Sequence, residues 1–176
     1  NNPDVHFLLG SCALTLPSPA KTLYPGNRIR IFKTMQRDST NDFMLWTGDY
    51  VYYANYHLKT KHGMFRRMNN QRVMFPEINS FQQQIANYAM WDDHDYGPNN
   101  SEGDFLFKEK SKWVFNMQWG NPIHESYQAN DGIYFNFKHK DIEVMMMDCR
   151  YEKFSGDSLK QMWGPTQLQW LKKHLK

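Results

Sequence analysis

Four apolar runs in this sequence each end in polar residues of the kind that bind metal ions or phosphate. The four ends are Gly10-Ser11-Cys12, Gly48-Asp49, Asp92-Asp93-His94 and Asp148-Cys149-Arg150. In open α/β folds, functional groups gather outside the carboxyl ends of the strands. One polar end is commonly only a turn, but four in one chain favour a shared site. We therefore expect an α/β fold in which the four runs are strands of one sheet. The strand residues that this arrangement brings together are Leu8, Leu45, Met90 and Met146.

The stretch Trp91 to Asn100 is the densest of the polar ends. It carries three carboxylates, an imidazole and two side-chain amides within ten residues. Gly97 and Pro98 exclude a regular helix, so we expect a turn at the end of a strand. Adjacent carboxylates repel each other unless a cation or strong donors compensate. A hard metal ion is one interpretation of this stretch, and a solvated acidic loop is the other.

Hydrophobic periodicity predicts the elements between these ends. The strands expected are 5–9, 43–47, 87–91 and 142–147, and the last of these pairs with 133–137 as a hairpin. The helices expected are 27–35, 78–85, 105–119 and 166–175. Loops are expected over 16–26, which contains prolines, and over 54–76, with some helix near 63–70. Because the last strand lies in a hairpin, the sheet must be mixed. The spacing of Leu168, Leu171 and Leu175 predicts the buried face of the last helix.

Composition favours one globular domain and gives no sign of a nucleic-acid partner or of a membrane span. The length of 176 residues suits a single domain with a proper core, and 16% of the residues are aromatic. The net charge of +3 is spread along the chain, so no Lys/Arg block indicates nucleic-acid binding. No apolar stretch has the length of a membrane span. The chain starts at Asn1 with neither Met nor a signal peptide, so we expect a processed or partial product.

Several residues at the polar ends have both a functional and a structural interpretation. Asp49 could bridge two cations through its two oxygens, and Tyr52 would share its face if a helical turn starts there. A Tyr52 phenolate suits trivalent iron, but the residue could equally be structural. Cys12 as a thiolate suits a soft or borderline metal, whereas a buried small hydrophobe or a disulfide to Cys149 are the alternatives. Arg150 offers a planar fork for a phosphoryl group or for a structural carboxylate.

Motifs spread over nearly the whole chain point to one family. They are Gly10-Ser11-Cys12, Trp46-Thr47-Gly48-Asp49-Tyr50-Val51-Tyr52-Tyr53, the run Trp91 to Asn100, Lys108-Glu109, Trp119-Gly120-Asn121-Pro122, Gly132-Ile133-Tyr134-Phe135, Met147-Asp148-Cys149-Arg150-Tyr151 and Gln167-Leu168-Gln169-Trp170-Leu171. With these motifs the chain resembles the PhoD-like family of metallophosphatases, alkaline phosphatase D and its relatives. The resemblance implies a mixed-sheet αββα sandwich of the α/β class that hydrolyses phosphate mono- or diesters.

The resemblance also implies a metal centre of iron with calcium. By similarity, Cys12, Asp49 and Tyr52 would hold iron. Asp49 would bridge the iron and the second metal, and Asn99 would bind the second metal. A thiolate that binds iron is not free to form a disulfide, so we expect Cys12 and Cys149 not to be bonded to each other.

The same resemblance implies roles for three further residues. His94 would sit beside the leaving group, and Asp93 would support it. Bridged cations lower the pKa of bound water, which gives a metal-bridged hydroxide in line with the leaving group. Arg150 and the metals would offset the charge that builds on phosphorus.

By this resemblance, residues 1–176 are the N-terminal part of a single PhoD-like domain. Family members continue past the Gln-x-x-Trp-Leu helix into a second half, where a Gly-Asp-x-His segment supplies further ligands. No such segment occurs in this sequence, so we expect an intact centre to need the missing C-terminal half. The resemblance also suggests an extracytoplasmic protein, periplasmic or secreted.

Two other functional interpretations stay open from the sequence. The chain could be a catalytically inactive PhoD-like fold that serves as a binding or assembly component. It could also be a plain α/β domain whose strand ends are ordinary turns. The enzyme is favoured by the combination of Cys12, Asp49, Tyr52 and Asn99. In a protein that had lost its metal centre, substitutions would have replaced such ligand residues.

Overall fold

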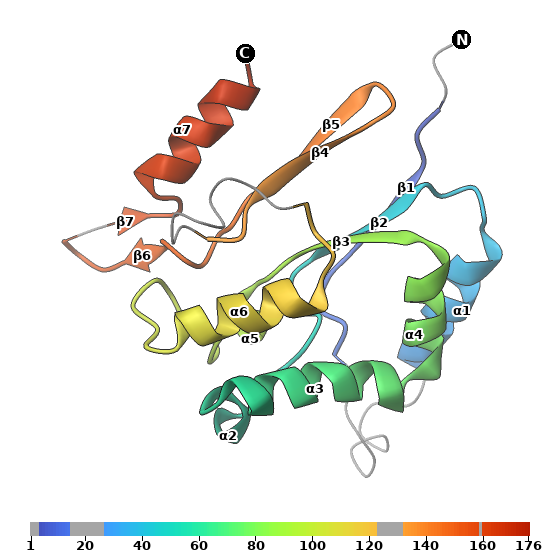
Figure 1. Ribbon diagram of the computed structural model, residues 1–176, viewed down its shortest axis with the longest axis horizontal. Coiled ribbons are helices and arrows are strands. Elements are labelled where there is room, and N and C mark those ends of the chain that lie inside the picture. Colours follow the sequence, from blue (N-terminus) through green and yellow to red (C-terminus); the bar gives the residue numbers. More distant parts are fainter. Residues whose placement is uncertain (1–3, 15–26, 123–131, 159) are drawn as a thin grey trace.

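The computed structural model describes residues 4–14, 27–122, 132–158 and 160–176 (Figure 1). Its elements are β1 Phe7–Gly10, α1 Asn27–Arg37, β2 Phe43–Thr47, α2 Asn55–Leu58, α3 Lys61–Met74, α4 Pro76–Gln84, β3 Ala86–Met90, α5 Asp93–Tyr96, α6 Lys108–Gln118, β4 Phe135–His139, β5 Ile142–Met146, β6 Phe154–Ser155, β7 Lys160–Gln161 and α7 Pro165–His174. The helices and strands expected from periodicity are confirmed in kind, whereas the short pair β6–β7 was not expected. The loop expected over 54–76 is wrong, because α2 and α3 occupy most of it. The loop expected over 16–26 falls outside the described residues.

The central sheet contains the first three apolar runs as parallel strands in the order β1-β2-β3. Phe7 lies opposite Phe43, and Thr47 lies opposite Met90. Because the strands are parallel, their carboxyl ends meet at one edge of the sheet. The prediction that these three runs share a sheet, with their polar ends together, is therefore confirmed.

The prediction that the run containing Met146 joins this sheet and makes it mixed is wrong among the described residues, because β1, β2 and β3 are all parallel. That run is β5, which pairs only with β4 in a separate antiparallel sheet among the described residues. The outer edge of β3 is already bonded, because the Asn121 amide donates to the Ala89 carbonyl (2.8 Å) and accepts from its N–H (2.9 Å). The hairpin satisfies its own backbone hydrogen bonds and packs against the face of the sheet instead of its edge.

Aromatic rings join the hairpin to the sheet. The Phe137 ring stacks on Tyr88 with centroids 3.7 Å apart and meets the ring of Phe43 edge-on at 5.3 Å. On the opposite face of β2, Trp46 packs against Phe32 of α1 and Phe81 of α4. Because side chains alternate along a strand, β2 contacts the hairpin with one face and the helices with the other.

Helix α7 packs on the hairpin and begins with Pro165 in its first turn, as expected (Figure 1). The Trp170 ring lies 4.9 Å from the ring of Tyr134. The predicted leucine stripe is wrong at Leu175, which is 68% exposed, and Leu168 and Leu171 are only partly buried. The buried residues of the helix are Gln167 and Trp170. Aromatic packing and the polar contacts of Gln167 outweigh the leucine pattern. Within the described residues, no helix combines the length and apolar character needed to span a membrane.

The acidic stretch contains one helical turn, α5, where only a non-helical turn was expected. The Tyr96 N–H donates to the Asp92 carbonyl at 3.1 Å, and the Gly97 N–H donates to the Asp93 carbonyl at 2.6 Å. The turn therefore forms before Gly97 and Pro98 and ends at them. Gly97 and Pro98 therefore prevent the helix from continuing, but they do not prevent this single turn.

Candidate metal centre

The chain enters the candidate centre through a left-handed turn after β2. Gly48 has φ +105° and Asp49 has φ +55°. Asp tolerates this region better than most residues, because its short side chain forms local hydrogen bonds. The Cys12 N–H donates to the Gly48 carbonyl at 3.0 Å and joins the ends of β1 and β2. This turn, and not the helical turn considered from the sequence, brings Tyr52 to Asp49.

Gly48 is required by both its backbone and its surroundings. A Cβ at this position would lie 2.5 Å from the Asp92 Cβ and 2.8 Å from the Asp92 nitrogen. We expect Gly48→Ala to lower the free energy of unfolding by about 1–3 kcal/mol from the backbone conformation alone, with the overlap adding to this. Gly156→Ala is the matched control, since a Cβ there meets nothing within 4 Å. Urea unfolding measures both, and equal small changes would contradict the close approach.

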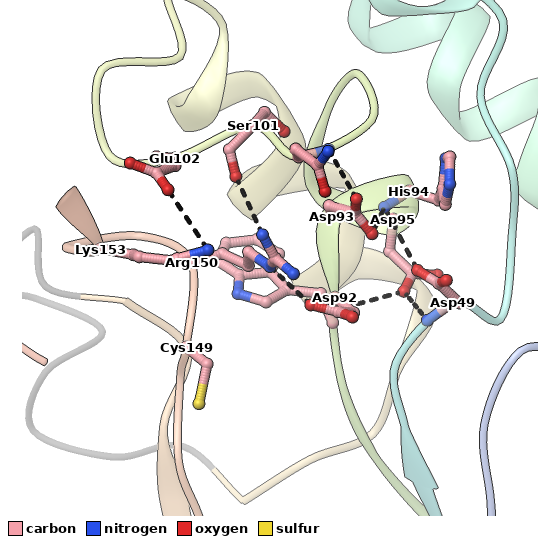
Figure 2. A network of polar contacts seen from close by, with 12 residues as sticks. Asp49, Asp92, Asp93, His94, Asp95, Ser101, Glu102, Cys149, Arg150 and Lys153 are labelled. Atoms are coloured by element: carbon pink, nitrogen blue, oxygen red, sulfur yellow. Dashed lines mark hydrogen bonds and ion pairs between the residues drawn. The ribbon is translucent and has the colours of Figure 1, made fainter. Parts of the chain in front are cut away.

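The Asp49 carboxylate is the centre of a cluster of donor atoms. The Tyr52 hydroxyl donates to Asp49 Oδ2 at 3.1 Å, and the Cys12 thiol lies 3.8 Å from the same oxygen. The His94 N–H donates to Asp49 Oδ1 at 3.3 Å. Ligand atoms of Asp49, Asp93 and His94 all lie within 4.8 Å of one another, and Figure 2 shows these three side by side. The structure thus brings together five of the seven residues expected at the site.

The charges within the cluster are unevenly compensated. Burial raises the pKa of Asp49, and the charge of Asp93 adds to the rise, although hydrogen bonds from Tyr52 and His94 oppose it. Burial also opposes ionisation of Asp93, but the Asn100 N–H and the nearby charges outweigh it and lower the pKa. Burial and the adjacent Asp49 raise the pKa of the Tyr52 hydroxyl. Two facing carboxylates with an imidazole, a thiol and a phenol form a donor set that fits a cation.

The two other expected site residues, Asn99 and Arg150, are not among the residues that contact Asp49. Asn99 is in the exposed turn after α5. The neighbouring Asn100 N–H donates to Asp93 Oδ2 at 2.6 Å. Asp93 contacts the backbone N–H of His94 at 3.1 Å, and the His94 ring lies 4.4 Å from that of Tyr52.

Arg150 points toward the acidic stretch but is held by a protein carboxylate (Figure 2). Its Nε donates to Asp92 Oδ1 at 2.5 Å, and its Nη1 donates to the Ser101 carbonyl at 3.4 Å. Of the two interpretations weighed from the sequence, the structure shows the contact with a carboxylate. Asp92 was not expected in this role.

Asp148 turns away from the centre, although it ends one of the four apolar runs. Its carboxylate accepts from the Trp91 indole (2.7 Å) and from backbone N–H groups of Ile133, Arg150 and Tyr151 (2.9–3.0 Å). It therefore holds the chain after β5 in place. Its neighbour Cys149 is a free thiol, as is Cys12.

Asp95 is the most deeply buried carboxylate beside the centre, and sequence reasoning assigned it no role. It accepts backbone N–H groups from Asp49 at 2.5 Å, Val51 at 2.9 Å and Asp92 at 3.1 Å. Burial raises the pKa of Asp95 to about 7, although these hydrogen bonds oppose the rise. The available signal was the spacing of Asp92 and Asp95, which is that of a capping box in which the later carboxylate accepts the earlier N–H.

Comparison with solved structures finds a similar fold in the structure of PhoD. The match has a TM-score of 0.72 and 16% sequence identity, and it covers 99% of this chain and 40% of the PhoD chain. The resemblance expected from the motifs is thus confirmed at the level of the fold, and the chain spans less than half the length of PhoD. No protein-family model matches the sequence. No curated protein sequence matches it either.

Proposed function

We propose that this chain is the N-terminal part of a metal-dependent phosphoesterase similar to PhoD. The observation that carries the proposal is the cluster of donor atoms around Asp49 at the carboxyl ends of three parallel strands. In the proposed protein, the helices, sheet, hairpin and α7 form the first half of a metallophosphatase-like αββα sandwich. A fold similar to PhoD supports this assignment.

The proposed centre takes its ligands from all three strand ends. Cys12, Asp49 and Tyr52 would hold one cation, for which the thiolate and phenolate suit iron. Asp49 would bridge to a second cation, and oxygen ligands such as the Asn99 amide suit calcium there. Asp93 lies close enough to Asp49 to join the set. The positive charge of two cations would offset the free-energy cost of burying the carboxylates of Asp49 and Asp93.

The chain's own residues bind and orient the substrate in this proposal. Cations bound here would supply a nucleophile by lowering the pKa of water and would neutralise charge on the phosphate. Arg150, oriented by Asp92, would donate hydrogen bonds to a phosphoryl oxygen. His94, packed on the Tyr52 ring, would lie beside the leaving group.

The complete activity is proposed for the longer protein. The chain covers 40% of PhoD, so further ligands would come from the missing C-terminal half of the domain. The proposed substrates are phosphate mono- or diesters, and the proposed location is extracytoplasmic. The inactive binding component stays the alternative function.

The test is metal analysis combined with turnover in the longer protein. We expect bound metal and hydrolysis of an aryl phosphate or an aryl phosphodiester, with both lost after chelation and regained when metal is returned. The 176-residue chain should show no turnover in the same assay, because part of its ligand set is absent. A longer protein that holds metal without hydrolysing either ester would favour the binding component. One that holds no metal would contradict the proposal.

A further inference from the structure

The ligand residue Asp49 lies in a backbone conformation that needs support from elsewhere. Its φ of +55° is unfavourable for a residue with a side chain. Its Oδ1 must nevertheless face the N–H of His94, which comes from a different segment, while its Oδ2 faces Tyr52 and Cys12. Free turns of this kind sample several conformations, so something must select the one that is observed.

Asp95 joins the two segments that supply the ligands. Its Oδ2 accepts the N–H of Asp49 after β2 and the N–H of Asp92 after β3, while its Oδ1 accepts the N–H of Val51. The side chain is 1% exposed. Because its oxygens are bonded to backbone N–H groups, Asp95 acts on the turn and not on the cation.

The position of Asp95 along the chain determines which distances it controls. It follows Asp93 and His94 within the single helical turn α5. Its two hydrogen bonds to the segment after β2 therefore set the separation between Asp49 and those two ligands. Figure 2 shows this connection from Asp95 to Asp92 and Asp49.

We propose that Asp95 is a positioning residue that holds the Asp49 turn in its metal-binding conformation before any cation arrives. This inference rests on the proposed metal site. Groups that orient a metal ligand typically contribute about 10–100-fold to metal affinity. In Asp95→Asn, an amide NH₂ replaces one of the two accepting oxygens, so at least one N–H donor loses its partner.

The test compares Asp95→Asn with Asp148→Asn in the longer protein by titration with Co²⁺. Both replaced carboxylates are buried and accept several N–H groups, but Asp148 bonds neither the Asp49 turn nor α5. We expect Asp95→Asn to weaken Co²⁺ binding roughly 10–100-fold and to change the visible absorption bands at saturation. Asp148→Asn should bind Co²⁺ as the unmutated protein does. Equal weakening in both variants, or none in Asp95→Asn, would overturn the proposal.

A measurement on the unmutated protein covers the case in which Asp95→Asn does not fold. Hydrogen exchange is followed at the Asp49 and Val51 amides in metal-free protein, with single-residue resolution from fragmentation mass spectrometry. Positioning by Asp95 requires slow exchange at both amides before metal is added. Fast exchange that becomes slow only with Co²⁺ would show that the cation orders the turn, and would overturn the inference. Absence of Co²⁺ binding to the unmutated protein would instead refute the proposed function.

Discussion

Replacement of Asp49 by Asn is expected to lower kcat/KM of the longer protein on an aryl phosphate by roughly 10⁴-fold. Asp49 Oδ1 and Oδ2 face different neighbours, His94 on one side and Tyr52 with Cys12 on the other. In the proposed centre, an amide would not offer two anionic oxygens to the cations, so metal binding and the activation of water that depends on it would both be lost. Metal content measured on the same samples should fall.

Arg150→Ala is the informative comparison for this result. Arg150 would supply one charge-assisted contact to the phosphate, and loss of one such contact costs about 10²-fold. Asp157→Asn serves as a neutral control, because that carboxylate is exposed. Similar modest losses in Asp49→Asn and Arg150→Ala, with metal still bound in the former, would mean that Asp49 is a turn residue.

Phe43→Ala is expected to have the largest effect on stability, a loss of about 3–5 kcal/mol in the free energy of unfolding. Phe43 is 1% exposed, and its ring contacts Phe7, Tyr88 and Phe137 at centroid distances of 5.3, 6.0 and 5.3 Å. Its removal leaves a cavity between the sheet and the hairpin. Domains of this kind are stable by only about 5–15 kcal/mol, so the loss is a large fraction.

Leu106→Ala is the control for the Phe43 experiment. Leu106 is 82% exposed, and surface substitutions usually change stability by less than about 0.5 kcal/mol. Urea unfolding of the two variants, followed by tryptophan fluorescence, measures the difference. A Phe43→Ala loss below about 1 kcal/mol would contradict the packing of the hairpin on the sheet.

The residues of the candidate centre differ in how far local sequence could identify them. Gly48-Asp49 after an apolar run indicates a turn at a strand end, and the parallel order of the strands then places Asp49 near Cys12 and His94. The alternation of strands and helices up to β3 is typical of parallel strands. Asp148 also ends an apolar run, yet its carboxylate binds four N–H donors away from the centre.

The sequence alone determined the longer helices and strands, and the edge of the sheet at which the polar ends of β1, β2 and β3 meet. Both follow from local periodicity and from the parallel connection of successive strands. Only the tertiary structure decided where the β4–β5 hairpin packs and which way each carboxylate turns. Asp95 and Asp93 lie two residues apart, but Asp95 is directed to the N–H groups of Asp49 and Val51. The direction of a carboxylate in an irregular turn depends on the donors that the rest of the fold places around it, and no spacing along the chain specifies them.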